Sequence, residues 1–398
     1  MFPCLTAHIP GTGGTIKESA EDFLVEEIPA YLPCGSGTHA YLVIEKRGIT
    51  TPEAIRRIAR QIGVNEKDVG YAGLKDAVGV TRQTISIEHI DLAMAEGLEL
   101  DRVKVLAVGR HTNKLKLGHL KGNRFTVTVR GISEQSSTIV PQVLEILRHR
   151  GVPNYFGYQR YGSQGSSHLI GEAMLKRDWK LAVDRLIGLP EAVRDDQWRR
   201  AIEAYHRGTM AESAALMPRH CRTEAEVLRT LAARPAEWEK AFSMINIRLR
   251  KLYLSAFQSF LFDRVVEKRI DTLDQIRHGD LAWKHTNGAC FLVEDADTEA
   301  PRAAGFDISP SGPIFGAKMT WPGGIQRQLE ESILAETGIT AEQFDLGNGL
   351  KLDGERRPLR IPITDVAWSI DADNVHLSFT LPKGSYATSV IREVTKKL

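Results

Sequence analysis

Apolar and polar positions alternate in several stretches of the first third of the chain, and this pattern predicts β-strands. The clearest case is residues 123–131, NRFTVTVRG, where Phe125, Val127 and Val129 alternate with polar side chains. A period of two is typical of a strand that buries one face. On the same grounds we predict strands at residues 39–48 and 84–89.

Helical signals lie between and after these strands. In residues 51–62, Thr51 can cap a helix, Pro52 suits its first turn and Gly63 can end it. We predict two more helices, at residues 140–149 and 169–179. Since short links join most of the strands, we expect an α+β fold with a mixed, largely antiparallel sheet.

The pattern changes after residue 180. Residues 181–270 are rich in helix-forming residues, and the apolar positions from Leu254 to Val265 recur every three or four residues. That spacing is typical of a long amphipathic helix. Residues 374–398 again read as a strand followed by a helix.

This return to the earlier pattern predicts an inserted domain. A polar stretch at residues 347–358, GNGLKLDGERRP, is interpreted as a linker. We expect a discontinuous catalytic domain of residues 1–180 and 347–398. The insert is then an α+β domain of residues 181–346, helix-rich at 181–270.

Composition changes this picture little. The 398 residues are 42% hydrophobic and 26% charged, as in ordinary globular enzymes, and no apolar run is long enough to span a membrane. No secretory signal is evident at the N-terminus. The cysteines are scattered, which favours free thiols in the cytoplasm over disulfides or a zinc site. They are Cys4, Cys34, Cys221 and Cys290.

Charge is unevenly distributed although the net charge is only +2. Residues 102–133 contain no Asp or Glu but eight Lys and Arg. Residues 146–171 also lack Asp and Glu and contain three Arg and two His. Such segments can form a face that binds a polyanion, or a solvated surface balanced by acids elsewhere in the fold. If the first holds, the candidate contacts to an RNA backbone are Lys114, Lys116, Lys121 and Arg124.

Two motifs contain candidate chemistry. Residues 70–83, GYAGLKDAVGVTRQ, place Lys75 and Asp76 in a glycine-marked turn, and residues 154–162 read NYFGYQRYG. Taken alone, an Asp in such a turn usually bonds the local backbone, and the aromatic residues would pack in a core. The alternative is that Asp76 is a reactive group held out on a tight loop.

The two motifs together resemble the signatures of TruD-type tRNA pseudouridine synthases. Three further stretches are similar to blocks of that family and occur in the same order; they are residues 120–125, 255–262 and 381–393. The resemblance implies a pseudouridine synthase-like fold and isomerisation of uridine without a cofactor or metal. It implies Asp76 as the essential carboxylate. An aspartate side chain in water has a pKa of about 3.9, so it is ionised at neutral pH.

The resemblance also implies roles for other residues. Lys17 would hold the carboxylate of Asp76 charged and oriented. Phe156 would stack on the flipped uracil, and Asn154 would bind its edge. Phe23 is expected to wall the pocket, with Gln83 and Arg160 as further substrate-binding candidates. Gly79 stands where the family often has Ala, which we expect to loosen the loop.

The partner implied is transfer RNA, modified at uridine 13, by a monomer with no protein partner and no membrane contact. Two alternatives stay open. The chain could act at another tRNA position or on another RNA, or it could be a non-catalytic RNA-binding or RNA-folding module of the same fold.

The basic segments predict that RNA binding depends steeply on salt. Four phosphate contacts would weaken binding roughly 100-fold between 50 and 200 mM salt, because bound counterions are released. Filter binding of unmodified tRNA across this range measures the slope. A flat dependence would contradict the predicted basic face.

Overall fold

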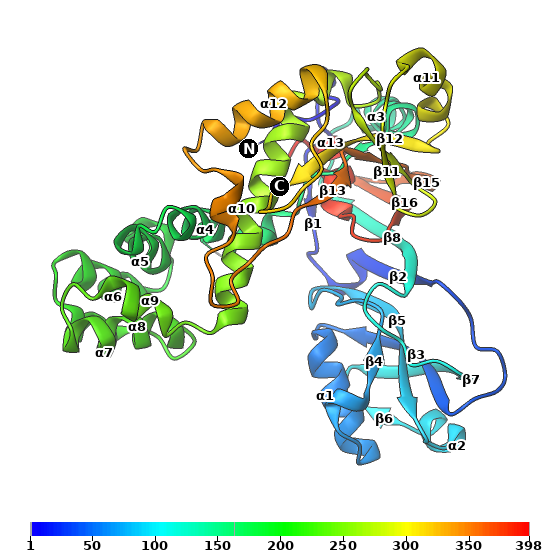
Figure 1. Cartoon of the computed structure of the whole chain (residues 1–398). Helices are drawn as coiled ribbons and strands as arrows, with labels where there is room; N and C mark the ends of the chain where they lie inside the picture. The colour runs from blue at the N-terminus through cyan, green and yellow to red at the C-terminus, as the bar shows by residue number, and fades with distance from the viewer. Residues whose placement is uncertain (1, 163, 398) are drawn as a thin grey trace. The chain divides into compact units, whose positions relative to one another are not determined.

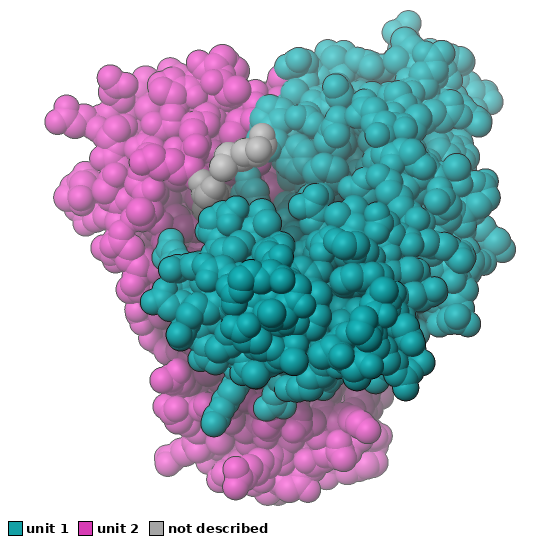
Figure 2. All heavy atoms as spheres, turned by 90° about the vertical axis from the view of Figure 1, so that its left-hand side faces the viewer, with its two compact units in different colours: residues 1–3, 153–360 teal, residues 4–152, 361–398 magenta. Residues whose placement is uncertain are grey.

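The computed structural model describes residues 2–162 and 164–397. The chain forms two compact units, one of residues 1–3 and 153–360 and the other of residues 4–152 and 361–398 (Figures 1 and 2). The chain changes unit within β9 (Val152–Pro153) and again within β14 (Arg360–Ile361). No helix in the described part of the chain is long and apolar enough to cross a membrane.

The unit of residues 4–152 and 361–398 is built on one sheet in the order β15-β16-β8-β2-β5-β3-β7-β6 (Figure 1). Of these neighbours only β2 and β5 are parallel, so the expected mixed, largely antiparallel sheet is confirmed. The strands are β2 (Phe23–Pro29), β3 (His39–Arg47), β5 (Val80–Glu88), β6 (Glu99–Leu100), β7 (Val103–His111), β8 (Leu120–Arg130), β15 (Thr364–Asp371) and β16 (Asn374–Pro382). The short strands β1 (Thr15–Ile16) and β4 (Gly70–Tyr71) pair with β8 and β5.

The alternating stretch at 123–131 falls in β8, where Phe125, Val127 and Val129 are buried as predicted. The helices of this unit are α1 (Thr51–Ile62), α2 (Leu92–Glu96), α3 (Ser136–Arg150) and α13 (Ala387–Thr395). One detail of the α1 prediction is wrong. The cap is Thr50, whose side chain accepts from the Glu53 amide, while Thr51 points into the core.

The other unit is mainly helical, with a small sheet in the order β11-β10-β12-β13. Its strands are β10 (Leu281–Lys284), β11 (Cys290–Leu292), β12 (Ile308–Ile314) and β13 (Glu355–Pro358). Its helices are α4 (Ser167–Leu175), α5 (Trp179–Ile187), α6 (Asp196–His206), α7 (Met210–Leu216), α8 (Arg222–Ala233), α9 (Trp238–Ser243), α10 (Ile247–Lys268), α11 (Ala296–Ala304) and α12 (Gly324–Ala335).

Helix α10 organises this unit. Its residues Leu254, Phe257, Leu261 and Val265 are fully buried, as the amphipathic pattern predicted. Helix α4 packs closely along it at Gly171, where a Cβ would lie 2.2 Å from the Tyr253 carbonyl oxygen.

The limits of the compact units differ from the predicted domain limits near 180 and 347. Helix α4 packs on α10, and β13 pairs with β12, so both belong to the unit of residues 153–360. The interpretation of residues 347–358 as a linker is wrong for residues 355–358, which form β13. The functional division into catalytic and inserted domains stays a prediction.

An ion pair between a buried aspartate and a partly exposed arginine, next to β2, yields a prediction about stability. Asp22 is 2% exposed and accepts from both Nε and a terminal nitrogen of Arg130, at 2.6–3.1 Å. These bonds lower the pKa of Asp22 to about 2. The carboxylate therefore stabilises the fold above its unfolded-state pKa, and this contribution is lost as pH falls toward 2.

Asp22→Asn should lower the free energy of unfolding by about 2 kcal/mol at pH 7, with the difference from the unaltered chain shrinking between pH 4 and 2. Urea unfolding at several pH values measures both. A difference that does not depend on pH would contradict the assigned ion pair.

Candidate active site

The Lys75–Asp76 turn connects β4 to β5, and its two charged side chains go in different directions. The Asp76 side chain is 44% exposed, whereas that of Lys75 is 6% exposed. The Lys17 ammonium lies 3.7 Å from Asp76 Oδ2. The turn thus offers a carboxylate to solvent with one cation beside it.

Lys17 also contacts the ring of Phe23. Its ammonium lies 4.2 Å from the centroid of the Phe23 ring, within the range of a cation–π contact. The backbone of Lys17 is left-handed, with φ of 62°, a conformation that costs energy for a residue other than glycine. Phe23 itself is buried and packs on Phe125, so its ring supports Lys17 from within the unit.

Lys75 is buried between two residues of the central sheet. Its ammonium lies 3.0 Å from Glu27 Oε2 and donates to Asn123 Oδ1 at 2.8 Å. Glu27 and Asn123 are directly opposite each other in the β2–β8 register. This cross-strand pair therefore binds the cation and fixes the turn to the sheet.

The backbone of the turn is fixed as well. The Lys75 amide donates to Thr51 Oγ1 at 2.9 Å, and the Thr51 hydroxyl donates to Gln83 Oε1 at 2.8 Å. Gln83 Nε2 donates to the Gly73 carbonyl at 3.2 Å. Gln83 is only 1% exposed, so in this structure it braces the turn from inside the core.

A second group of predicted residues lies in the unit of residues 153–360. Phe156 is half-buried; its amide donates to Asp263 Oδ1 at 2.9 Å, and its ring meets Phe262 edge-on. The guanidinium of Arg357 lies 4.5 Å from the Phe156 ring centroid, and that of Arg160 lies 5.7 Å from it. Two cations therefore lie close to this aromatic ring.

Asn154 and Arg160 support this arrangement. Asn154 is 3% exposed; its amide nitrogen donates to the Pro358 carbonyl at 2.8 Å, and its oxygen accepts from Arg357 at 2.6 Å. Arg160 donates to Ser259 Oγ at 3.0 Å and also to Ser255 Oγ, both on α10. Asn154 thus orients Arg357 against Phe156.

Comparison with known proteins identifies the family. The family model for tRNA pseudouridine synthase D (TruD) matches residues 2–394. The chain is 58% identical over 392 residues to tRNA pseudouridine synthase D of Geobacter metallireducens, covering 98% of this chain and 97% of the relative. The corresponding protein of Thermus thermophilus is 36% identical over 406 residues, covering 99% and 92%.

The chain belongs to the TruD family. A crystal structure assigned as a tRNA pseudouridine synthase D from Methanosarcina mazei has the same fold, with a TM-score of 0.84 at 26% identity. The match covers 100% of the present chain and 96% of the Methanosarcina mazei chain. The family resemblance seen in the five sequence blocks is thereby confirmed.

The structure corrects one expectation about a departure from the family pattern. Gly79 has φ of 126°, and a Cβ there would lie 2.4 Å from the Phe23 carbonyl oxygen. Glycine at this position therefore lets the loop pack closely on Phe23, and it does not loosen the loop.

The predicted RNA-backbone residues of this TruD protein differ in their surroundings. Lys116, Lys121 and Arg124 are exposed, and within the described residues their side chains make no hydrogen bond or ion pair. Lys114 is half-buried, and its ammonium donates to the Lys67 carbonyl at 3.1 Å. The first three are available to a phosphate in this structure.

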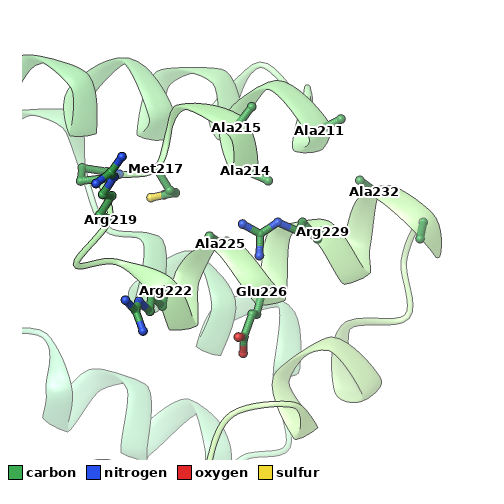
Figure 3. A pocket seen from close by; sticks show the side chains of 12 residues that line it. Ala211, Ala214, Ala215, Met217, Arg219, Arg222, Ala225, Glu226, Arg229 and Ala232 are labelled. Atoms are coloured by element: carbon green, nitrogen blue, oxygen red, sulfur yellow. The ribbon is translucent and has the colours of Figure 1, made fainter.

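The helical part of residues 179–243 contains a feature that the motifs did not predict. A hollow of about 830 Å³ lies between α7 and α8, with alanines on its walls and Arg229 extending into it (Figure 3). None of the predicted site residues lines this hollow.

Sequence reasoning missed four residues of the two groups: Glu27, Thr51, Asn123 and Arg357. Asn123 lies in the LKGNRF block, which resembles the family, but the resemblance implied no role for this residue. Glu27 and Thr51 act only through tertiary contacts, and Arg357 fell in the stretch interpreted as a linker.

The buried Lys75–Glu27 pair predicts a large effect on stability. Lys75→Met should lower the free energy of unfolding by about 3 kcal/mol, because it leaves the Glu27 carboxylate buried without its cation. Adding Glu27→Gln should restore much of the loss. Urea unfolding measures both variants.

Lys176→Met is the matched control, since Lys176 pairs with Glu172 at an exposed site and should change stability by less than about 0.5 kcal/mol. Equal losses for Lys75→Met and Lys176→Met would show that the pair does not fix the turn.

Proposed function

We propose that this chain isomerises uridine 13 of transfer RNA to pseudouridine, with Asp76 as the essential carboxylate. The observation that carries the proposal is the half-exposed Asp76 with Lys17 at 3.7 Å, on a turn anchored by a buried cation. Membership of the TruD family and the names of the relatives support the same reaction and substrate.

The reaction breaks the bond from C1′ to N1, rotates the uracil and joins C1′ to C5. The proton on C5 is released and N1 is protonated, so the product is an isomer and no oxidant or reductant is consumed. Asp76 acts as nucleophile or base, a role that needs an ionised, accessible carboxylate. Lys17 stabilises that charge and orients the group.

The uridine must leave its base stack before Asp76 can act, at a cost of a few kcal/mol. Phe156 offsets this cost by stacking on the flipped uracil, a contact worth roughly 1–3 kcal/mol. Arg357 and Arg160 hold the ring and add positive charge for the neighbouring phosphates. Asn154 orients Arg357, Phe23 holds Lys17 in place, and Gln83 braces the Lys75–Asp76 turn.

The remaining proposals concern the setting of the reaction. Lys116, Lys121 and Arg124 bind the RNA backbone, and the half-buried Lys114 is a fourth contact to it. The enzyme works as a monomer in the cytoplasm, since each role is filled within one chain and all four cysteines are free thiols, as is usual in a reducing compartment.

Mapping pseudouridine after incubation with an unmodified tRNA pool tests the proposal. The unaltered enzyme should form product at position 13, and Asp76→Asn should lower the rate about 100-fold or more, because the amide can act neither as base nor as nucleophile. Affinity for tRNA should change little.

Asp68→Asn is the control, because Asp68 is exposed in the same unit and should keep full activity. Pseudouridine at another tRNA position would support the proposed reaction but reject uridine 13 as its substrate. Binding without product in the unaltered chain would favour the non-catalytic module.

A further inference from the structure

A buried lysine lies directly beneath the Lys75–Asp76 turn. Lys46, on β3, is fully buried, and its strand neighbours are Thr81 of β5 and Val103 of β7. Within residues 2–162 and 164–397, no carboxylate lies within ion-pair distance of its ammonium. Burying an ammonium without a counter-ion is costly, so its hydrogen bonds must offset the loss of water.

Those hydrogen bonds all go to backbone carbonyls. The Lys46 ammonium donates to the Ile49 carbonyl at 2.7 Å, to the Asp76 carbonyl at 2.7 Å and to the Lys75 carbonyl at 3.4 Å. An ammonium has three donors, so these three acceptors use all of them. Ile49 directly precedes the Thr50 cap of α1, so one side chain joins the start of α1 to the turn.

This contact acts on the direction of the Asp76 side chain. The carbonyl of residue 76 and that of residue 75 are both bound, so the peptide plane between the two residues and the Cα of Asp76 are held in place. The amide of Lys75 is bound to Thr51 Oγ1, also at the start of α1. The turn is therefore linked to the start of α1 in two ways: directly, by the Lys75 amide, and through Lys46, by the carbonyls of Lys75 and Asp76.

We propose that Lys46 is a positioning residue for the isomerisation, which fixes the backbone of the turn so that the Asp76 carboxylate is presented in one direction. The proposal rests on the proposed function, because it assigns Lys46 a role through Asp76. Neither the family signatures nor the predicted site residues include Lys46.

The protonation state of Lys46 gives this role a pH dependence. Burial lowers the pKa of Lys46 to about 8; the charged groups facing it are Asp76, which raises the pKa, and Lys75, which lowers it. Above this pH the neutral amine has only two donors for three carbonyls. Between about pH 8 and 10.5 the unfolded chain binds the proton that the folded chain has released, so the Lys46 contribution to stability rises with pH. Deprotonation of Lys46 therefore does not itself destabilise the fold in this window.

The first experiment compares Lys46→Met with the unaltered enzyme on unmodified tRNA. Lys46→Met keeps the apolar stem and removes the donors, so kcat should fall about 100-fold, as expected for a displaced catalytic group. KM should stay within about twofold, because no RNA contact is removed. Lys67→Met, which removes an exposed lysine of the same unit, should behave as the unaltered enzyme.

The second experiment follows activity against pH. The unaltered enzyme should lose activity above about pH 8. Lys46→Arg, whose guanidinium stays protonated, should restore part of kcat relative to Lys46→Met and should lack that decline. Hydrogen exchange should show faster exchange at residues 72–77 in Lys46→Met with β3 and β5 still protected.

A kcat for Lys46→Met close to that of the unaltered enzyme would overturn the proposal, as would a decline near pH 8 that keeps the same midpoint in Lys46→Arg. If Lys46→Met does not fold, the pH profiles of the unaltered enzyme and of Lys46→Arg decide the question. Activity retained by Asp76→Asn would instead reject the proposed function, so the two failures are distinguishable.

Discussion

The candidate site depends on a cation buried in the sheet. Lys75 lies between Glu27 and Asn123, which face each other across β2 and β8. This pair explains why a lysine and an aspartate stand next to each other in a glycine-marked turn. The lysine points inward and anchors the turn, and the next residue, Asp76, is thereby left facing solvent. Breaking the pair would leave a buried charge and release the turn that carries the carboxylate.

Cations placed against aromatic rings recur in both units. Lys17 lies over Phe23 in one unit, and Arg357 lies over Phe156 in the other. Each cation is thus held on one side by an apolar ring, which limits the directions in which it can move. Each cation also contacts a residue with a proposed chemical role. Lys17 lies beside Asp76, the proposed reactive group, and Arg357 lies against Phe156, the ring proposed to stack on the uracil.

The sequence predicted those features that depend on local pattern. The alternation in β8, the Pro52 and Gly63 signals at the two ends of α1 and the apolar stripe of α10 all have a physical cause within a few residues, and all were confirmed. Features that depend on distant partners were not predicted. Gln83 was predicted as a substrate contact, but it is buried and accepts a hydrogen bond from Thr51. Arg357 lies in a polar stretch that pairs with β12 and shows no alternation of apolar and polar residues. The cap of α1 was misplaced because Thr50 and Thr51 are equivalent as residue types, and only the fold decides which one points inward.

The central claim is that a fixed position of the carboxylate, and not its charge alone, allows catalysis. The most direct test is the single-turnover rate of Asp76→Glu on unmodified tRNA, because this change keeps the charge and moves the carboxylate by one methylene group. We expect the rate to fall about 100-fold with tRNA affinity unchanged. A rate within about tenfold of the unaltered enzyme would contradict the claim, since it would show that the turn need not hold the carboxylate in one place.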